Sequence, residues 1–128
     1  MDEKNPKIGI LIPVYSTVPS TSFSNITNFI LGNAKKYPIM LSIVDSTFIT
    51  LARNRLIDNF LKSNADYALF IDSDMVLPHN AIEGLLSHKK DAISALYLRR
   101  LPPHEPVAMK KNNEKYENIK QIPSQDDF

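Results

Sequence analysis

Three short, nearly uninterrupted apolar runs alternate with segments of helical spacing, and this alternation limits the possible folds more than any other feature. The runs are KIGILIPV at residues 7–14, IMLSIV at 39–44 and YALFI at 67–71. Between them, apolar residues recur at intervals of three and four, which predicts helices over residues 23–34 and 51–62. Strands buried on both faces and joined by helices form parallel sheets. We therefore expect an α/β fold with a mostly parallel sheet flanked by helices.

Prolines and hydroxyl residues predict where these elements begin and end. Pro13 has no N–H to donate to a neighbouring strand, so we expect the first strand to end there. Thr47 or Thr50 is expected to cap the second helix, because their hydroxyls accept hydrogen bonds from free backbone N–H groups. Pro78 is well placed to open a further short helix.

The sequence after residue 90 predicts less regular structure. AISALYL at residues 92–98 is expected to form a fourth strand, and an edge strand is expected near 107–110. Residues 111–128 are polar, which favours a partly disordered tail. These features predict one α/β domain over residues 7–110, followed by that tail.

Composition excludes several classes of protein. The chain has 128 residues, no cysteine and a formal net charge of +1. Without cysteine it cannot be a disulfide scaffold, a zinc finger or a thiol-dependent enzyme. The balanced charge argues against nucleic-acid binding, which normally requires a basic excess. No apolar run is long enough to span a membrane, and the MDEK start does not resemble a signal peptide, so we expect a cytoplasmic location.

Polar and proline residues follow the predicted strands at the points where each one ends. In open parallel sheets, ligands bind beyond the carboxyl ends of the strands. The sequence therefore predicts a site at this edge. Its candidate residues are Pro13, Val14 and Tyr15 after the first strand, Asp45 after the second, Asp72, Ser73 and Asp74 after the third, and Arg99 and Arg100 after the fourth.

Asp72 and Asp74 are the strongest candidates for chemistry. Side chains two positions apart on an extended chain point the same way, so the two carboxylates would repel each other without a cation between them. Carboxylate oxygens suit Mg²⁺ or Mn²⁺, and Mg²⁺ takes only one or two protein carboxylates beside water and phosphate. The alternative is that one aspartate caps the following helix while the other faces solvent.

Three motifs together carry a family resemblance. PVY follows the first strand, ARN opens a helix, and ADYALFIDSDM precedes a helix that begins with proline. In their content and order, these motifs resemble the nucleotide-sugar-binding half of family 2-type glycosyltransferases with the GT-A fold. The resemblance covers residues 7–110. It implies a Rossmann-like sheet, in a short or truncated version, and an enzyme that transfers a sugar from a nucleotide-diphosphate donor.

The same resemblance assigns roles to individual residues. It implies a DxD motif in which Asp72 and Asp74 hold Mn²⁺ or Mg²⁺, with Asp72 toward the ribose and Asp74 on the metal. Pro13, Val14 and Tyr15 would line the nucleobase pocket, with Asp45 reading the base or the ribose. A metal held by carboxylates also needs no glycine-rich phosphate loop, and this chain has only 3 glycines.

Other charged residues have two possible interpretations. Arg53 lies at the centre of the apolar face of its helix, which favours contact with the nucleotide or with a carboxylate such as Asp72 over a solvated position. Arg99 and Arg100 could approach the diphosphate or form a solvated pair. His104, in the proline-rich LPPHEP, could contact a metal or acceptor, and the alternative is an ordinary surface histidine.

The resemblance leaves the catalytic base unassigned. An inverting enzyme of this type needs a downstream acceptor-binding half, and Asp126 and Asp127 follow no apolar strand that would position a base. We therefore expect that a further segment, or a partner in a homo-oligomer, completes the site. The acceptor itself, whether glycan, lipid or protein, is not specified.

Two other functions compete with this one. Asp72-Ser73-Asp74-Met75-Val76 also matches the D-x-D-x-T/V motif of haloacid-dehalogenase-type phosphatases, in which the first aspartate is the nucleophile. That motif normally lies on the first strand, however, and leads into a glycine-containing turn. The second alternative is a module that binds a nucleotide sugar without turning it over.

Overall fold

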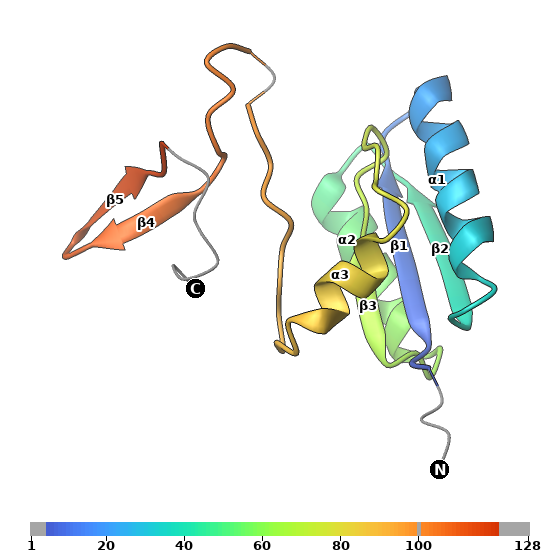
Figure 1. Ribbon diagram of the computed structural model, residues 1–128. Coiled ribbons are helices and arrows are strands. Elements are labelled where there is room, and N and C mark those ends of the chain that lie inside the picture. Colours follow the sequence, from blue (N-terminus) through green and yellow to red (C-terminus); the bar gives the residue numbers. More distant parts are fainter. Residues whose placement is uncertain (1–4, 100, 121–128) are drawn as a thin grey trace. The chain divides into compact units, whose positions relative to one another are not determined.

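A computed structural model describes residues 5–99 and 101–120 of the chain. The chain divides into two compact units, Met1–Gly84 and Leu85–Phe128. The first unit holds a parallel sheet with its helices, and the second holds an antiparallel hairpin (Figure 1). The domain boundary expected near residue 110 falls inside the first strand of that hairpin.

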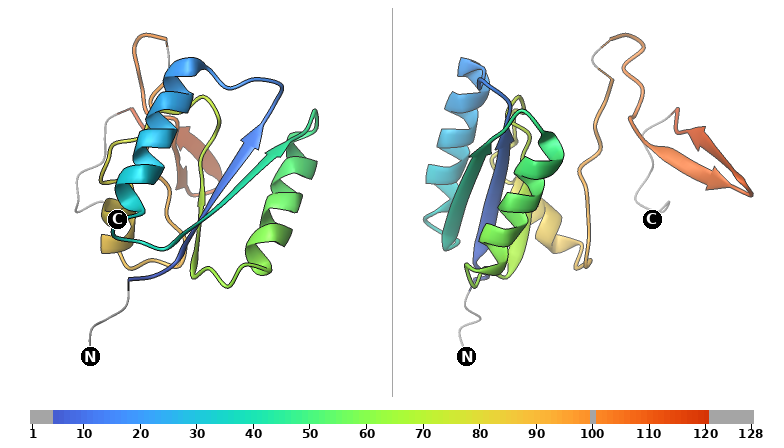
Figure 2. Two further views of the ribbon diagram at one scale, coloured as in Figure 1. Left: turned by 90° about the vertical axis from the view of Figure 1, so that its right-hand side faces the viewer. Right: turned by 180° about the vertical axis from the view of Figure 1, so that it is seen from behind.

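The first unit confirms the predicted α/β alternation. Its elements are β1 (Ile8–Val14), α1 (Ser20–Asn33), β2 (Ile39–Asp45), α2 (Ile49–Leu61), β3 (Tyr67–Phe70) and α3 (Ala81–Ser87), whose last residues belong to the second unit. The strands form a small open sheet in the order β2-β1-β3, with both pairings parallel. Helices α1 and α2 cover opposite faces of this sheet, as Figure 2 shows. The arrangement is compatible with a Rossmann-like fold.

The centre of the core is β1, whose residues are all buried. Successive side chains of a strand point to opposite faces, so Ile8 and Ile10 face α1, whereas Gly9 and Leu11 face α2. The α2 side is closed by Ala52 and Leu56, which are fully buried. A strand covered on both faces must be apolar throughout, which explains the uninterrupted run in the sequence.

Pro13 does not end β1, contrary to the prediction, because of the direction in which its missing N–H would point. Ser46 N donates to Val14 O at 3.1 Å, so alternate residues of β1 bond to β2. The residues between them bond to β3, where Ile71 N donates to Leu11 O at 3.0 Å. Pro13 therefore lacks a donor only on the β3 side, and the β1–β3 pairing stops at Leu11 while the β1–β2 pairing continues to Val14.

The predicted threonine cap of the second helix is also wrong. Helix α2 begins at Ile49 with Phe48 as its N-cap, and no side chain accepts a hydrogen bond there. Thr50 lies inside the first turn, where it cannot act as the cap. Before the helix, Phe48 N donates a hydrogen bond to Ser46 Oγ at 3.2 Å and closes a local turn.

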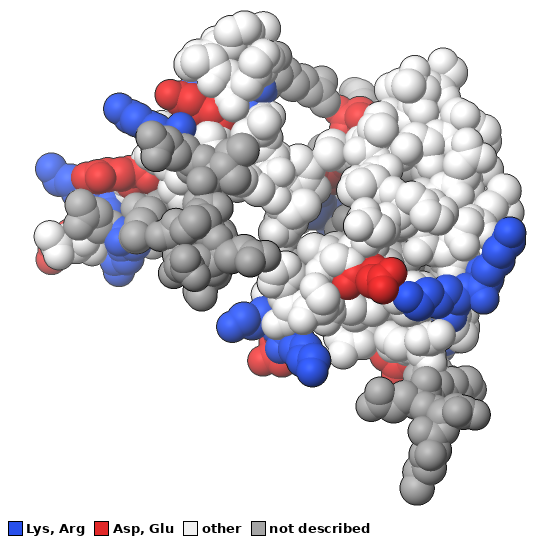
Figure 3. All heavy atoms as spheres, viewed as in Figure 1, with Lys and Arg blue, Asp and Glu red and all other residues white. Residues whose placement is uncertain are grey.

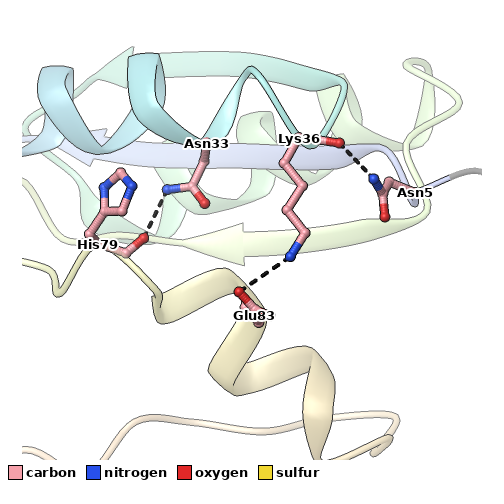
Figure 4. A network of polar contacts seen from close by, with 5 residues as sticks. All are labelled: Asn5, Asn33, Lys36, His79 and Glu83. Atoms are coloured by element: carbon pink, nitrogen blue, oxygen red, sulfur yellow. Dashed lines mark hydrogen bonds and ion pairs between the residues drawn. The ribbon is translucent and has the colours of Figure 1, made fainter.

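Polar contacts join the end of α1 and the turn after it to the segment that leads into α3 and to α3 itself (Figure 4). Asn33 Nδ2 donates to His79 O at 3.0 Å, and Lys36 Nζ lies 3.3 Å from Glu83 Oε2. The hydrogen bond to Glu83 is the main cause that raises the pKa of Lys36 above 10.5. These contacts fix the course of the chain after the candidate aspartates.

The second unit corrects one predicted strand. Residues 92–98 form no strand, because a run of apolar residues becomes one only where another strand lies alongside to share hydrogen bonds. The end of this run instead pairs locally, through Val107 N to Tyr97 O at 2.6 Å and Arg99 N to Glu105 O at 2.8 Å. Strands β4 (Met109–Asn112) and β5 (Lys115–Asn118) form the hairpin. Strand β4 overlaps the edge strand expected near 107–110, and the hairpin continues into the segment expected to be a polar tail.

Within the described part of the chain, none of the helices has the length and hydrophobicity that crossing a membrane requires.

Candidate functional site

The carboxyl edge of the three-stranded sheet brings together most of the residues singled out in the sequence. From β1 the chain passes to β2 on one side and then returns past β1 to β3 on the other. Such a reversal of strand order is where open α/β sheets bind ligands. Tyr15, Asp45 and Asp72 follow or end β1, β2 and β3, so all three lie at this edge.

Asp45 ends β2 beside the loop that leaves β1. Ser16 N donates to Asp45 Oδ1 at a distance of 3.4 Å, which is long for a hydrogen bond. Ser16 has a positive φ of 65°, so the loop turns sharply directly after Tyr15. The Asp45 carboxylate is exposed and is held only weakly, which leaves it able to accept hydrogen bonds from a ligand.

Asp72 is joined to Arg53 by an ion pair. Arg53 Nη2 lies 2.8 Å from Asp72 Oδ1, and the guanidinium carbon lies 5.3 Å from the centre of the Phe70 ring. The apolar surroundings expected for Arg53 are therefore provided by an aromatic ring, on which a guanidinium can stack. The two side chains remain 44% and 51% exposed, so this pair is open to solvent and to a ligand.

Asp72, Ser73 and Asp74 form a tight turn after β3. Met75 N donates to Asp72 O at 3.1 Å, and both aspartates are exposed while Ser73 is half-buried. Among residues 5–99 and 101–120, no cluster of three or more His, Asp or Glu side chains is positioned to hold a metal. The turn thus offers two carboxylates, and the Asp72 carboxylate is paired with Arg53. This donor set fits a hard cation that takes its remaining ligands from water and phosphate.

Comparisons with protein-family models, curated proteins and solved structures found no match to this chain. Its function must therefore be inferred from its own residues.

The structure does not bring every predicted residue to the edge as an exposed group. Pro13 and Val14 are buried members of β1, so of the PVY motif only Tyr15 presents its side chain to solvent, with 66% exposed. Arg99 and His104 belong to the second unit, where the His104 ring nitrogen Nδ1 lies 3.0 Å from Arg99 O. Arg100, Asp126 and Asp127 lie outside the described residues.

One residue that supports the site was missed in the sequence. Asn25 of α1 accepts a hydrogen bond from Leu77 N at 2.7 Å and donates to Leu77 O at 3.2 Å. It thereby holds the chain three residues beyond Asp74. Asn25 is half-buried beside the apolar stripe of α1. A polar residue beside such a stripe is the signal that could have identified it.

Proposed function

We propose that the first unit binds a nucleotide-diphosphate sugar and is the donor-binding half of a GT-A-type glycosyltransferase. The observation that carries this proposal is the position of Asp45 and Asp72 at the carboxyl ends of the two strands that flank β1, with Arg53 paired to Asp72. A nucleotide sugar offers hydroxyl donors, which suit carboxylates, and a diphosphate, which suits a cation.

Each exposed residue has a role in this proposal. The ring of Tyr15 stacks on or borders the base, and Asp45 accepts hydrogen bonds from the base or the ribose. Asp72 faces the ribose with the carboxylate oxygen that Arg53 does not occupy. Arg53 carries five N–H donors and uses some of them on Asp72, so the others remain available to the diphosphate.

Asp74, with Asp72, would hold Mn²⁺ or Mg²⁺ against the diphosphate. When bound, the cation neutralises charge that develops on the departing diphosphate. The side chains of Arg53 and Tyr15 orient the donor, and an acceptor hydroxyl displaces the diphosphate at the anomeric carbon. The base that accepts the hydroxyl proton lies beyond the residues that we assign.

Calorimetric titration of the full chain with UDP, GDP and their sugars, with and without Mn²⁺, tests this proposal. We expect Mn²⁺-dependent binding of at least one of them and its loss in Asp74→Asn. The matched control is Asp58→Asn, which removes an exposed carboxylate from α2 and should leave binding unchanged. Absence of Mn²⁺-dependent binding to every nucleotide would refute the proposal.

Product analysis separates the enzyme from its alternatives. Transfer or hydrolysis of the sugar that disappears in Asp74→Asn supports a glycosyltransferase, whereas binding without turnover supports a non-catalytic module. A covalent aspartyl-phosphate formed at Asp72 after incubation with a phosphate donor would instead support the haloacid-dehalogenase-type phosphatase.

A further inference from the structure

The outer edge of β2 carries a row of backbone groups that point away from the sheet. Pro38 O accepts from Ile8 N at 2.9 Å and Ser46 N donates to Val14 O at 3.1 Å, so the even-numbered residues of this stretch bond to β1. Successive residues of a strand point their backbone groups in opposite directions. Ile39, Leu41, Ile43 and Asp45 therefore direct their N–H and C=O groups outward, and no described strand pairs with them.

This edge lacks the features that normally prevent strands from pairing with another chain. Exposed edges usually carry a lysine, a proline or a bulge. The seven residues of β2, IMLSIVD, contain none of these, and their single charge is Asp45 at the end. Leu41 and Ile43 are 45% and 57% exposed, on the face of the sheet that α1 covers. The edge therefore offers both hydrogen bonds and apolar contact.

We propose that β2 pairs antiparallel with β2 of a second copy of this chain, which joins the two sheets into one of six strands. The inference of this dimer does not rest on the proposed donor binding. The register that uses every outward residue sets Leu41 opposite the partner's Ile43 and Ile39 opposite the partner's Asp45. Residues with outward backbone groups then form hydrogen-bonded pairs, and Ser42 lies on the two-fold axis opposite the partner's Ser42.

Charge complementarity favours a second copy in this orientation. Lys35 precedes β2 by four residues and Asp45 ends the strand, so the chain is basic before β2 and acidic at its end, whereas Lys36 is already paired with Glu83. Figure 3 shows basic side chains gathered beside the C-terminal end of α1, where the chain leads into β2. Antiparallel pairing brings the acidic end of each strand toward the basic end of the other, whereas parallel pairing would bring like charges together.

A cysteine cross-link tests the predicted axis directly. The chain has no cysteine, so Ser42→Cys introduces a single thiol. Residues opposite each other in a non-hydrogen-bonded antiparallel pair have Cα atoms about 4.5 Å apart, which is within the range of disulfides. We expect mild oxidation to give a covalent dimer of Ser42→Cys at high yield, but not of the control Ser24→Cys on the exposed side of α1. Equal cross-linking of both variants, or none at residue 42, would overturn the proposal.

Sedimentation velocity over a concentration series tests association without a new bond. We expect the unmodified chain to dimerise reversibly, Ile43→Lys to sediment as a monomer, and the control Leu61→Lys to behave like the unmodified chain, since Leu61 is 71% exposed on α2.

Hydrogen exchange provides a readout that does not depend on any variant. The amides of Leu41 and Ile43 should become protected as concentration rises. A monomer at all concentrations, or a monomer whose Leu41 amide is already protected by another part of the chain, would contradict the dimer.

Discussion

Arg53 Nη2 and Asp72 Oδ1 lie 2.8 Å apart, and this ion pair joins helix α2 to the turn that follows β3. The two residues are 19 positions apart in the sequence, and β3 lies between them. The pair orients the Asp72 carboxylate at the candidate site.

Replacing Arg53 should affect donor binding far more than folding. Because the ion pair is half-exposed, we expect Arg53→Ala to change the free energy of unfolding by less than about 1 kcal/mol. If Arg53 contacts the diphosphate, losing its charged hydrogen bonds costs about 1.5–3 kcal/mol of binding, or roughly a 10- to 100-fold loss of affinity. Urea unfolding and calorimetry measure the two effects. Arg55→Ala, on the solvent-facing side of the same helix, is the control and should change neither.

Asn25 should stabilise the chain after the aspartates. Asn25→Ala leaves both backbone groups of Leu77 without their side-chain partner in a part-buried position, and we expect a loss of about 1–3 kcal/mol in unfolding free energy. Exchange of the Leu77 amide should accelerate more than that of core amides in β1. The exposed Asn28→Ala in the same helix serves as the control. Unchanged exchange at Leu77 would show that Asn25 does not hold this segment.

The ring of His79 occupies the space beside Gly32. A Cβ at residue 32 would overlap His79 Cε1 and lie 3.1 Å from its Nδ1. Because His79 is exposed, its ring can turn away from a new Cβ, so we expect Gly32→Ala to change the free energy of unfolding by less than about 1 kcal/mol, and His79→Ala to restore the stabilisation of a helical Gly-to-Ala change in the double variant. Gly84→Ala is the matched control. A Cβ there meets no atom within 4 Å, so this helical substitution should stabilise by about 0.4–1 kcal/mol.

Gly9 should be required because α2 packs against it in the core. A Cβ on Gly9 would lie 2.8 Å from Phe60 Cδ2, so Gly9→Ala must displace the helix or the ring. A destabilisation of about 1–3 kcal/mol is expected in thermal or urea unfolding. Adding Phe60→Leu should recover part of it, because the shorter side chain vacates the space. If the double variant is no more stable than Gly9→Ala, the contact with Phe60 is not the cause.

The raised pKa of Lys36 predicts a weak dependence of stability on alkaline pH. Glu83 favours the charged amine in the folded state, so the contribution is fully present below the unfolded pKa and is lost as pH rises through the higher folded pKa. Glu83→Gln should lower the pKa of Lys36 toward 10.5, as followed by NMR titration of its side chain. Asp58→Asn, on the opposite face of the sheet, should have no effect on that pKa. An unchanged pKa in Glu83→Gln would remove the ion pair as its cause.

The local pattern of residues was sufficient to predict the three parallel strands and the helices between them. A strand that is buried on both faces is apolar throughout, and a helix that is buried on one side has apolar residues at intervals of three and four. Each element can therefore be recognised from its pattern of apolar residues. The same reasoning placed Asp45 and Asp72 after strands, and hence at one edge of the sheet. It also put Arg53 on an inward-facing side of its helix.

The tertiary structure alone determined the strand ends and side-chain contacts that depend on other segments of the chain. Pro13 continues its strand because its missing N–H lies on the side where β3 has already ended, and residues 92–98 form no strand because their partners are the local residues 105–107. Arg53 reaches Asp72 because β3 pairs with β1 and the turn after β3 comes to lie next to α2. No short segment of the sequence predicts this arrangement. Side-chain periodicity reports which face of an element is buried, whereas pairing, register and contact distances depend on residues far away in the chain.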